Sequence, residues 1–170
     1  MNKKIFTMIF LVALTAGTVS AQTSADDPEI QKAKEETALV FDLGRYFGFI
    51  YQMHAEESKL ALAAGQMDEI FRIMQTIKSL ERIEPEEAEK LLVRLEDEIL
   101  TPDQLIYVDQ LAIERMEARD TSTEQNTPGS GAGQILSYIG GGAFNPMTDE
   151  RKTIGKDFAA FYNYLAKKVG

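Results

Sequence analysis

The sequence contains no cysteine and no tryptophan, and His54 is its single histidine. Without cysteine, the chain has neither a disulfide framework nor thiolate ligands for a metal. After residue 16, no apolar run approaches the roughly 20 residues that a membrane-spanning helix needs. Positive charge is also scarce, since 18 basic residues face 27 acidic ones and the net charge is −9. The sequence therefore predicts no membrane span. Because a nucleic-acid binder needs a basic face, the acidic charge also predicts no nucleic-acid partner.

Catalytic motifs are absent as well. Neither a Gly-x-Ser-x-Gly nucleophile elbow nor a His-Glu-x-x-His zinc motif occurs. The glycine-rich run 129–133 has no preceding strand pattern and lacks the Lys-Ser/Thr ending of a phosphate-binding loop. We therefore predict a protein that is not an enzyme and that uses no cofactor.

The first 21 residues have the pattern of a secretory signal peptide. Lys3 and Lys4 form a basic start, residues 5–16 are apolar, and Val19 and Ala21 supply the small residues of a cleavage site. Cleavage near Ala21 predicts an exported protein, periplasmic or extracellular. It removes two basic residues and no acidic one, so the mature chain of 149 residues carries a net charge of −11 instead of −9.

Beyond this segment, apolar residues recur at the three- and four-residue spacing of amphipathic helices. The predicted helices span residues 29–64, 66–83, 85–99, 102–119 and 149–168. Gly65 is the predicted break between the first two. Pro28, Pro85 and Pro102 stand at first helical positions, where proline is tolerated, and Thr101 with Gln104 fits a capping box. The predicted fold class is all-α, a four- to five-helix antiparallel bundle with the first helix at its centre.

Composition divides the mature chain into four parts. Residues 22–28 form a flexible start, and residues 29–119 form the helical bundle. The segment 120–134 is rich in Gly, Ser, Thr, Asn and Pro, which is typical of a flexible linker. Residues 135–170 contain an apolar turn segment and the C-terminal helix, and this tail carries five basic and three acidic residues from Asp149 onward.

Residues 38–53 form the densest apolar stretch of the mature chain, with five aromatic residues within eleven positions. The apolar positions continue most of the way round a helix, as in a central, buried helix. Gly44 and Gly48 lie four residues apart and leave a shallow groove where another helix can approach. The candidate ligand- or partner-binding residues are Phe41, Gly44, Phe47, Gly48 and Tyr51. Two interpretations stay open, a pure core helix and a groove whose rim binds a partner.

His54 and Glu57 share one helical face and are the candidate metal ligands of this chain. A protein metal site normally needs three or four protein ligands, so we predict no metal site and a partly exposed helical histidine. Met67, Met74 and Met116 are scattered, which predicts core fillers or the flexible edge of a binding surface.

The run Leu100-Thr101-Pro102-Asp103-Gln104 resembles the LTxxQ motif of the Spy-like periplasmic stress proteins. In that family the motif caps a helix, and paired subunits form a cradle that holds non-native proteins or senses damage to the envelope. The resemblance covers these five residues and the helix that follows them. It implies an all-helical periplasmic protein with a chaperone-like or sensing role.

Together these features predict a non-enzymatic exported envelope protein that acts through helix-mediated protein interaction, either as a chaperone-like protein or as an adaptor. Its partner would be an unidentified protein or a set of client proteins, and a homodimer is compatible with the same features. The alternative interpretation is a binding module that holds a small apolar ligand or a lipid between its helices, around residues 41–51.

Overall fold

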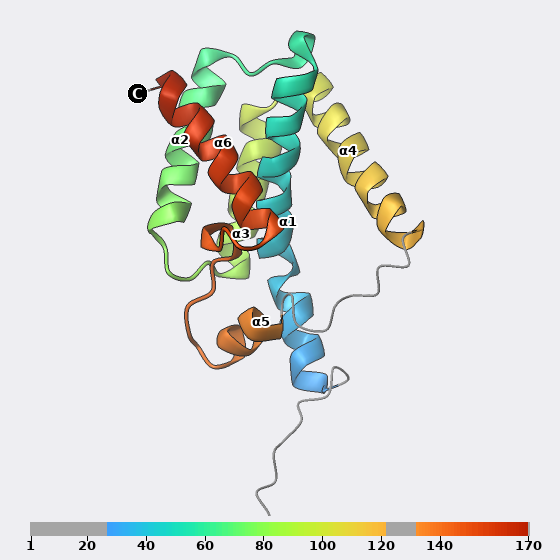
Figure 1. The fold of residues 1–170 in the computed structure, drawn as a ribbon, viewed down its shortest axis with the longest axis vertical. Coiled ribbons are helices and arrows are strands. Elements are labelled where there is room, and N and C mark those ends of the chain that lie inside the picture. The colour runs from blue at the N-terminus through green and yellow to red at the C-terminus, as the bar shows by residue number, and fades with distance from the viewer. Residues whose placement is uncertain (1–26, 122–131, 170) are drawn as a thin grey trace, which may run out of the picture.

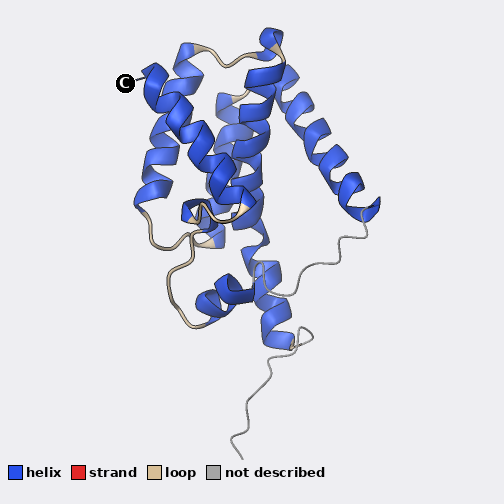
Figure 2. Ribbon diagram, viewed as in Figure 1, coloured by secondary structure: helices blue, strands red, loops and turns tan. Residues whose placement is uncertain are grey.

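The computed structural model describes residues 27–121 and 132–169, and no β-strand occurs in these two ranges (Figures 1 and 2). Six α-helices are present in them: α1 (Pro28–Glu56), α2 (Ala64–Ser79), α3 (Pro85–Val93), α4 (Pro102–Thr121), α5 (Ala132–Ile139) and α6 (Thr153–Val169). Short 3-10 helices η1 (Ser58–Leu60) and η3 (Pro146–Thr148) and a π-helix η2 (Arg94–Ile99) connect them. The prediction of an all-α fold is confirmed. The predicted signal peptide lies outside the described residues.

The helix count exceeds the predicted four to five because α5 forms where the sequence indicated an apolar turn segment. This helix begins at Ala132 and α4 extends to Thr121, so both ends of the predicted linker 120–134 are helical. The α5 helix ends at Ile139, and Gly141, two residues later, has a φ of 69°. Glycine adopts this left-handed conformation without steric cost and commonly ends helices.

Three of the predicted helix starts are confirmed at their prolines, since α1, α3 and α4 begin at Pro28, Pro85 and Pro102. The predicted capping box is also present. The Thr101 backbone N–H donates to Gln104 Oε1 at 2.9 Å, and the Gln104 N–H donates to Thr101 Oγ1 at 3.4 Å. These local signals therefore act as the sequence indicated.

The boundary between the first two helices differs from the prediction. The α1 helix ends at Glu56 instead of residue 64, and Gly65 lies inside α2 instead of breaking the chain. The α2 helix begins early because the Gln66 side chain accepts the Ala63 backbone N–H at 2.9 Å, which satisfies an otherwise unpaired donor. The turn that joins the helices is formed by η1 and residues 61–63.

The last helix begins at Thr153, four residues after the predicted start. The preceding residues form η3, where the Asn145 side chain accepts the Met147 backbone N–H at 3.2 Å. The Asn145 side-chain amide also donates to the carbonyls of Ile77 and Leu80, at 2.8 Å each. These bonds hold the segment before α6 against the end of α2, so the α-helix starts only after it.

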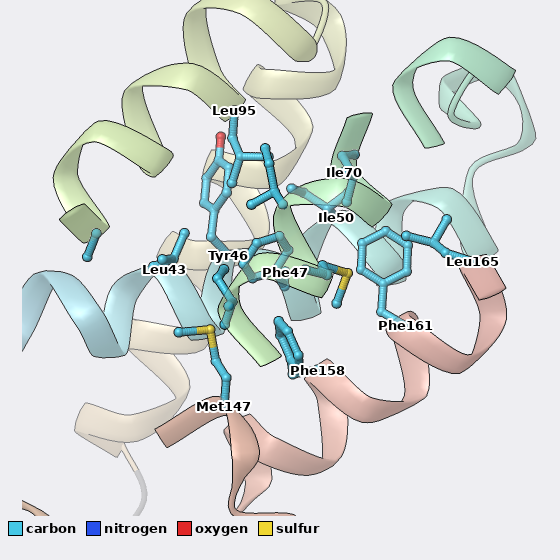
Figure 3. Close-up of a cluster of buried hydrophobic side chains, with 14 of the residues drawn as sticks. Leu43, Tyr46, Phe47, Ile50, Ile70, Leu95, Met147, Phe158, Phe161 and Leu165 are labelled. Atoms are coloured by element: carbon cyan, nitrogen blue, oxygen red, sulfur yellow. The ribbon is translucent and has the colours of Figure 1, made fainter. Parts of the chain in front are cut away.

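The α1 helix occupies the centre of the bundle, as predicted, and it contacts α3, α4, α5 and α6 (Figure 1). The α6 helix covers α1 and also packs against α2. The core between them consists of aliphatic, methionine and aromatic side chains (Figure 3). Its largest fully buried members are Phe47, Phe144, Phe158, Phe161, Leu43, Ile50, Met53, Ile70, Met74, Ile77, Ile83 and Leu95. Within the described ranges, no helix is long and apolar enough to cross a membrane.

Candidate functional site

The aromatic residues proposed as a binding site pack against the C-terminal part of the same chain. Phe47 is completely buried, and its ring meets the ring of Phe158 edge-on at 5.4 Å between centroids (Figure 3). Tyr51 is half-buried and stacks on Phe161 at 5.2 Å. Their contacts on α6 therefore explain the burial of these rings without any bound ligand.

Phe41 has the same kind of partner, since its ring meets the Phe144 ring edge-on at 5.7 Å. Gly44 and Gly48 do allow the close helix approach that the sequence indicated. A Cβ atom on Gly44 would overlap the side chain of Ile154, and one on Gly48 would lie 3.4 Å from the Cβ of Asp157. The approaching helix is α6 of the same chain, so the groove predicted for a partner is occupied within the bundle.

His54 joins two distant parts of the chain through both of its ring nitrogens. Its Nδ1 accepts the Leu62 backbone N–H at 2.9 Å, so the proton of the neutral ring lies on Nε2, which donates to the Tyr164 hydroxyl oxygen at 2.7 Å. Glu57 instead accepts the Lys59 backbone N–H at 3.4 Å, at the start of η1. Among the residues that the structure describes, no cluster of three or more metal-ligating side chains exists.

We expect His54 to make the folded protein less stable in mild acid. Burial and then the positive charge of Lys168 lower the pKa of His54 below its usual 6.5. The unfolded chain therefore binds a proton more readily than the folded one. The contribution of neutral His54 to the free energy of unfolding is complete above about pH 6.5 and is lost as the pH falls toward the lower pKa of the folded state. Between pH 7.5 and 5.5, the melting temperature should fall more steeply for the natural protein than for His54→Gln. Equal slopes of melting temperature against pH would contradict this prediction.

Buried Gln104 and half-buried Gln66 form a polar cluster that the sequence did not reveal. Gln66 Nε2 donates to Gln104 Oε1 at 2.7 Å and to the Ile99 carbonyl at 2.7 Å. Gln104 Nε2 donates to the Leu60 carbonyl at 3.0 Å. The capping role of Gln104 was readable from its spacing to Thr101, but the second role depends on chain segments more than 30 residues apart. The cluster ties the start of α2 to the start of α4, which is a structural role.

The exposed side of α4 carries apolar side chains that are mostly open to solvent. Ile106, Ile113 and Met116 are 66%, 56% and 67% exposed, and we call these three residues the α4 apolar face. Spacings of seven and three residues place them on one side of the helix. Buried Gln104 and Val108 anchor only the first half of α4 to the bundle. Residues 113–118 are exposed, and Figure 1 shows this half diverging from α1.

This surface was not predicted, because α4 also has a regular apolar pattern on its buried side. Of the three residues, only Met116 was singled out, as a core filler or the edge of a binding surface, and the structure places it in solvent. The detectable signal was that Ile106 and Ile113 fall outside the pattern formed by Leu105, Val108 and Leu111. A second apolar stripe on one helix favours a second contact.

Two open depressions on the described part of the bundle have walls that mix polar and apolar side chains. The larger, of about 910 Å³, lies between α5 and the segment before α6 and is lined by residues that include Glu81, Gln134, Ser137, Asn145, Asp149 and Arg151. The smaller, of about 310 Å³, is lined by residues of α2, α3 and η2 that include Glu69, Arg72 and Arg94. A site for an apolar ligand is usually an enclosed, mostly apolar cavity, whereas both depressions are open to solvent and carry charged side chains.

Comparison of the chain with protein-family models, with curated proteins and with solved structures finds no match.

Proposed function

We propose that this chain is an exported, non-enzymatic protein that binds another protein through the α4 apolar face. One observation carries the proposal, namely that Ile106, Ile113 and Met116 are each more than half exposed on one side of a helix. Exposed apolar side chains that gather on one face indicate an interaction surface, whereas isolated ones are ordinary. Methionine suits such a surface because its flexible side chain adapts to different partners.

This proposal moves the predicted binding surface from α1 to α4. Phe41, Phe47 and Tyr51 contact Phe144, Phe158 and Phe161 of the same chain, which leaves them little free surface for a partner. The α4 helix is attached through its first half, and its residues 113–118 are exposed. A projecting amphipathic helix can insert its apolar face into a groove of another protein or cover an apolar segment of a client. Both an adaptor and a chaperone-like protein would use this geometry.

The test is the aggregation of lysozyme after reduction with dithiothreitol, a reagent that leaves this cysteine-free chain unchanged. We expect the natural protein to slow the aggregation, and the triple variant Ile106→Ser/Ile113→Ser/Met116→Ser to lose most of this effect. Because the three side chains are exposed, the melting temperature should change little.

The matched control is Leu39→Ser/Leu136→Ser, which replaces exposed apolar residues on α1 and α5. This variant has the same net charge and should retain full protection of the client. Equal activity of the triple variant and the natural protein would remove the α4 apolar face from the mechanism. A natural protein with no effect would contradict the chaperone-like form of the proposal.

A further inference from the structure

The turn that joins α1 to α2 is attached to the ring of His54. The Leu62 backbone N–H donates to His54 Nδ1 at 2.9 Å, and Leu62 is buried, with 5% of its surface exposed. On the other side of the ring, Nε2 donates to the hydroxyl of Tyr164 on α6 at 2.7 Å. The ring therefore uses one nitrogen as an acceptor and the other as a donor, which only the neutral form of histidine can do.

A second set of bonds joins the same turn to the start of α4. The Leu60 carbonyl, in η1, accepts a bond from Gln104 Nε2 at 3.0 Å, and Gln104 is in turn bonded to Gln66 at 2.7 Å. Figure 1 shows the end of α1, the start of α4 and the C-terminal end of α6 at the same end of the bundle. Residues 57–63 therefore lie between His54 on one side and the polar cluster that anchors α4 on the other.

Protonation of His54 is incompatible with its bond to the turn. A proton on Nδ1 changes this atom from an acceptor into a donor, so it would face the N–H of Leu62 as a second donor. The bond at Nε2 does not conflict in this way, because that nitrogen already donates. His54 lies within the continuous helix α1, whereas residues 61–63 belong to no helix. The turn is therefore the part that moves.

The surroundings of the ring oppose protonation as long as the turn is in place. The ammonium group of Lys168, on α6, lies 5.7 Å from the centroid of the Tyr164 ring that His54 contacts. Burial and then the charge of Lys168 lower the pKa of His54. Opening of the turn exposes the ring to water, which restores its ordinary affinity for a proton. The other charged residues close to His54 in the sequence, on α1 and the turn, are Glu56, Glu57 and Lys59.

We propose that His54 is a pH-sensitive switch, whose protonation in mild acid releases residues 57–63 and with them one anchor of α4. When the turn leaves, Gln104 loses the Leu60 carbonyl, and Gln66 loses the backbone N–H that its side chain accepts at residue 63. A buried polar network with missing partners is destabilised as a unit, so the first turn of α4 loosens as well. The inference concerns how α4 is held and not what it binds, so it does not rest on the proposed function.

The experiment measures amide hydrogen exchange of the full chain by NMR at pH 7.5 and pH 5.5, expressed as protection factors. Leu62 reports on the turn, and Leu105, whose N–H donates to the Thr101 carbonyl at 2.9 Å, reports on the start of α4. We expect both protection factors to fall by about fivefold to tenfold at pH 5.5. Tenfold is roughly the maximum over this range, because His54 in the open turn titrates near its usual pKa of 6.5.

A matched control is the amide of Gly142, which donates to the Ser137 carbonyl at 2.8 Å in the turn after α5. Its local opening does not involve His54, so its protection factor should be the same at both pH values. A fall at Gly142 as large as that at Leu62 would show a general effect of acid and would overturn the proposal.

Two variants test the atom that carries the switch. Glutamine offers both an acceptor and a donor but does not titrate in this range, so His54→Gln should abolish the fall at Leu62 and Leu105. Tyr164→Phe removes the partner of Nε2 and leaves the bond at Nδ1, so the fall should persist. A fall that persists in His54→Gln, or that disappears in Tyr164→Phe, would show that the bond between Nδ1 and Leu62 does not carry the switch.

A core amide shows whether the opening is local. Ile83 is completely buried, and its N–H donates to the Phe144 carbonyl at 2.9 Å, so it exchanges only when the whole fold opens. At pH 5.5 we expect Leu62 to be protected at least about tenfold less than Ile83. Equal protection of the two would mean that the turn opens only by global unfolding, and a fall at Leu62 without one at Leu105 would mean that α4 is not coupled to it. Either result overturns the switch and leaves the proposed function unaffected, because the triple serine variant tests that function at neutral pH.

Discussion

Phe47→Ala is expected to lower the free energy of unfolding by about 3–5 kcal/mol, the usual cost of removing a buried phenylalanine. Phe47 is completely buried at the centre of the bundle, and its ring packs edge-on against Phe158 (Figure 3). The substitution would remove that contact and leave a cavity between α1 and α6, two helices held together mainly by such side chains. Urea unfolding followed by far-ultraviolet circular dichroism measures the loss directly.

Two controls show whether this loss follows burial. Phe49 lies two residues away on the same helix but is only half-buried, so Phe49→Ala should lower the free energy of unfolding clearly less. Ile113→Ala, on the α4 apolar face, should change stability by no more than about 0.5 kcal/mol, as is usual for exposed positions. Similar losses at Phe47 and Phe49 would show that the ring of Phe47 is not the centre of the core. A large loss at Ile113 would mean that the α4 apolar face is already covered in the free protein.

Gly155→Ala is expected to destabilise the protein by about 2 kcal/mol, although alanine is the better helix former. Gly155 lies in the first turn of α6, and a Cβ atom there would overlap the backbone carbonyl of Asp149 and lie 2.9 Å from the Glu150 nitrogen. Backbone atoms cannot rotate away as a side chain can. The turn before α6 would have to move, and with it η3, whose Met147 is buried against the core.

The matched control is Gly65→Ala, at a helical glycine whose added Cβ would meet no atom within 4 Å. There the substitution should stabilise the protein by up to about 1 kcal/mol, the difference in helix propensity between the two residues. Thermal and urea unfolding of both variants checks the pair. If Gly155→Ala is neutral, the turn that contains Asp149 is not held against α6. If Gly65→Ala is destabilising, its backbone is not helical.

Local order in the chain was readable from the sequence because its causes are local. Proline at a first helical position and the reciprocal bonds of Thr101 and Gln104 involve neighbours within one helical turn, and both features are present in the structure. Helical spacing likewise places five apolar residues on one side of the second predicted helix, namely Ile70, Ile73, Met74, Ile77 and Leu80; the first four are buried and Leu80 is half-buried. Helix ends were less accurate because they depend on contacts with other segments, such as the bonds of Asn145 to the carbonyls at the end of α2.

The sequence by itself determined that this chain is all-helical and that α1, with its apolar residues most of the way round, lies at the centre. Only the tertiary structure decided which apolar residues remain free for a partner. Phe47 and Ile113 both look like core residues, yet α6 covers Phe47 and no described segment covers Ile113. His54 bonds to Tyr164, which lies 110 positions later in the sequence. The groove beside Gly44 is likewise filled by a distant segment, α6. Helical periodicity records that a face is apolar, but the surface that buries it comes from elsewhere in the chain, so burial depends on the packing of the whole fold.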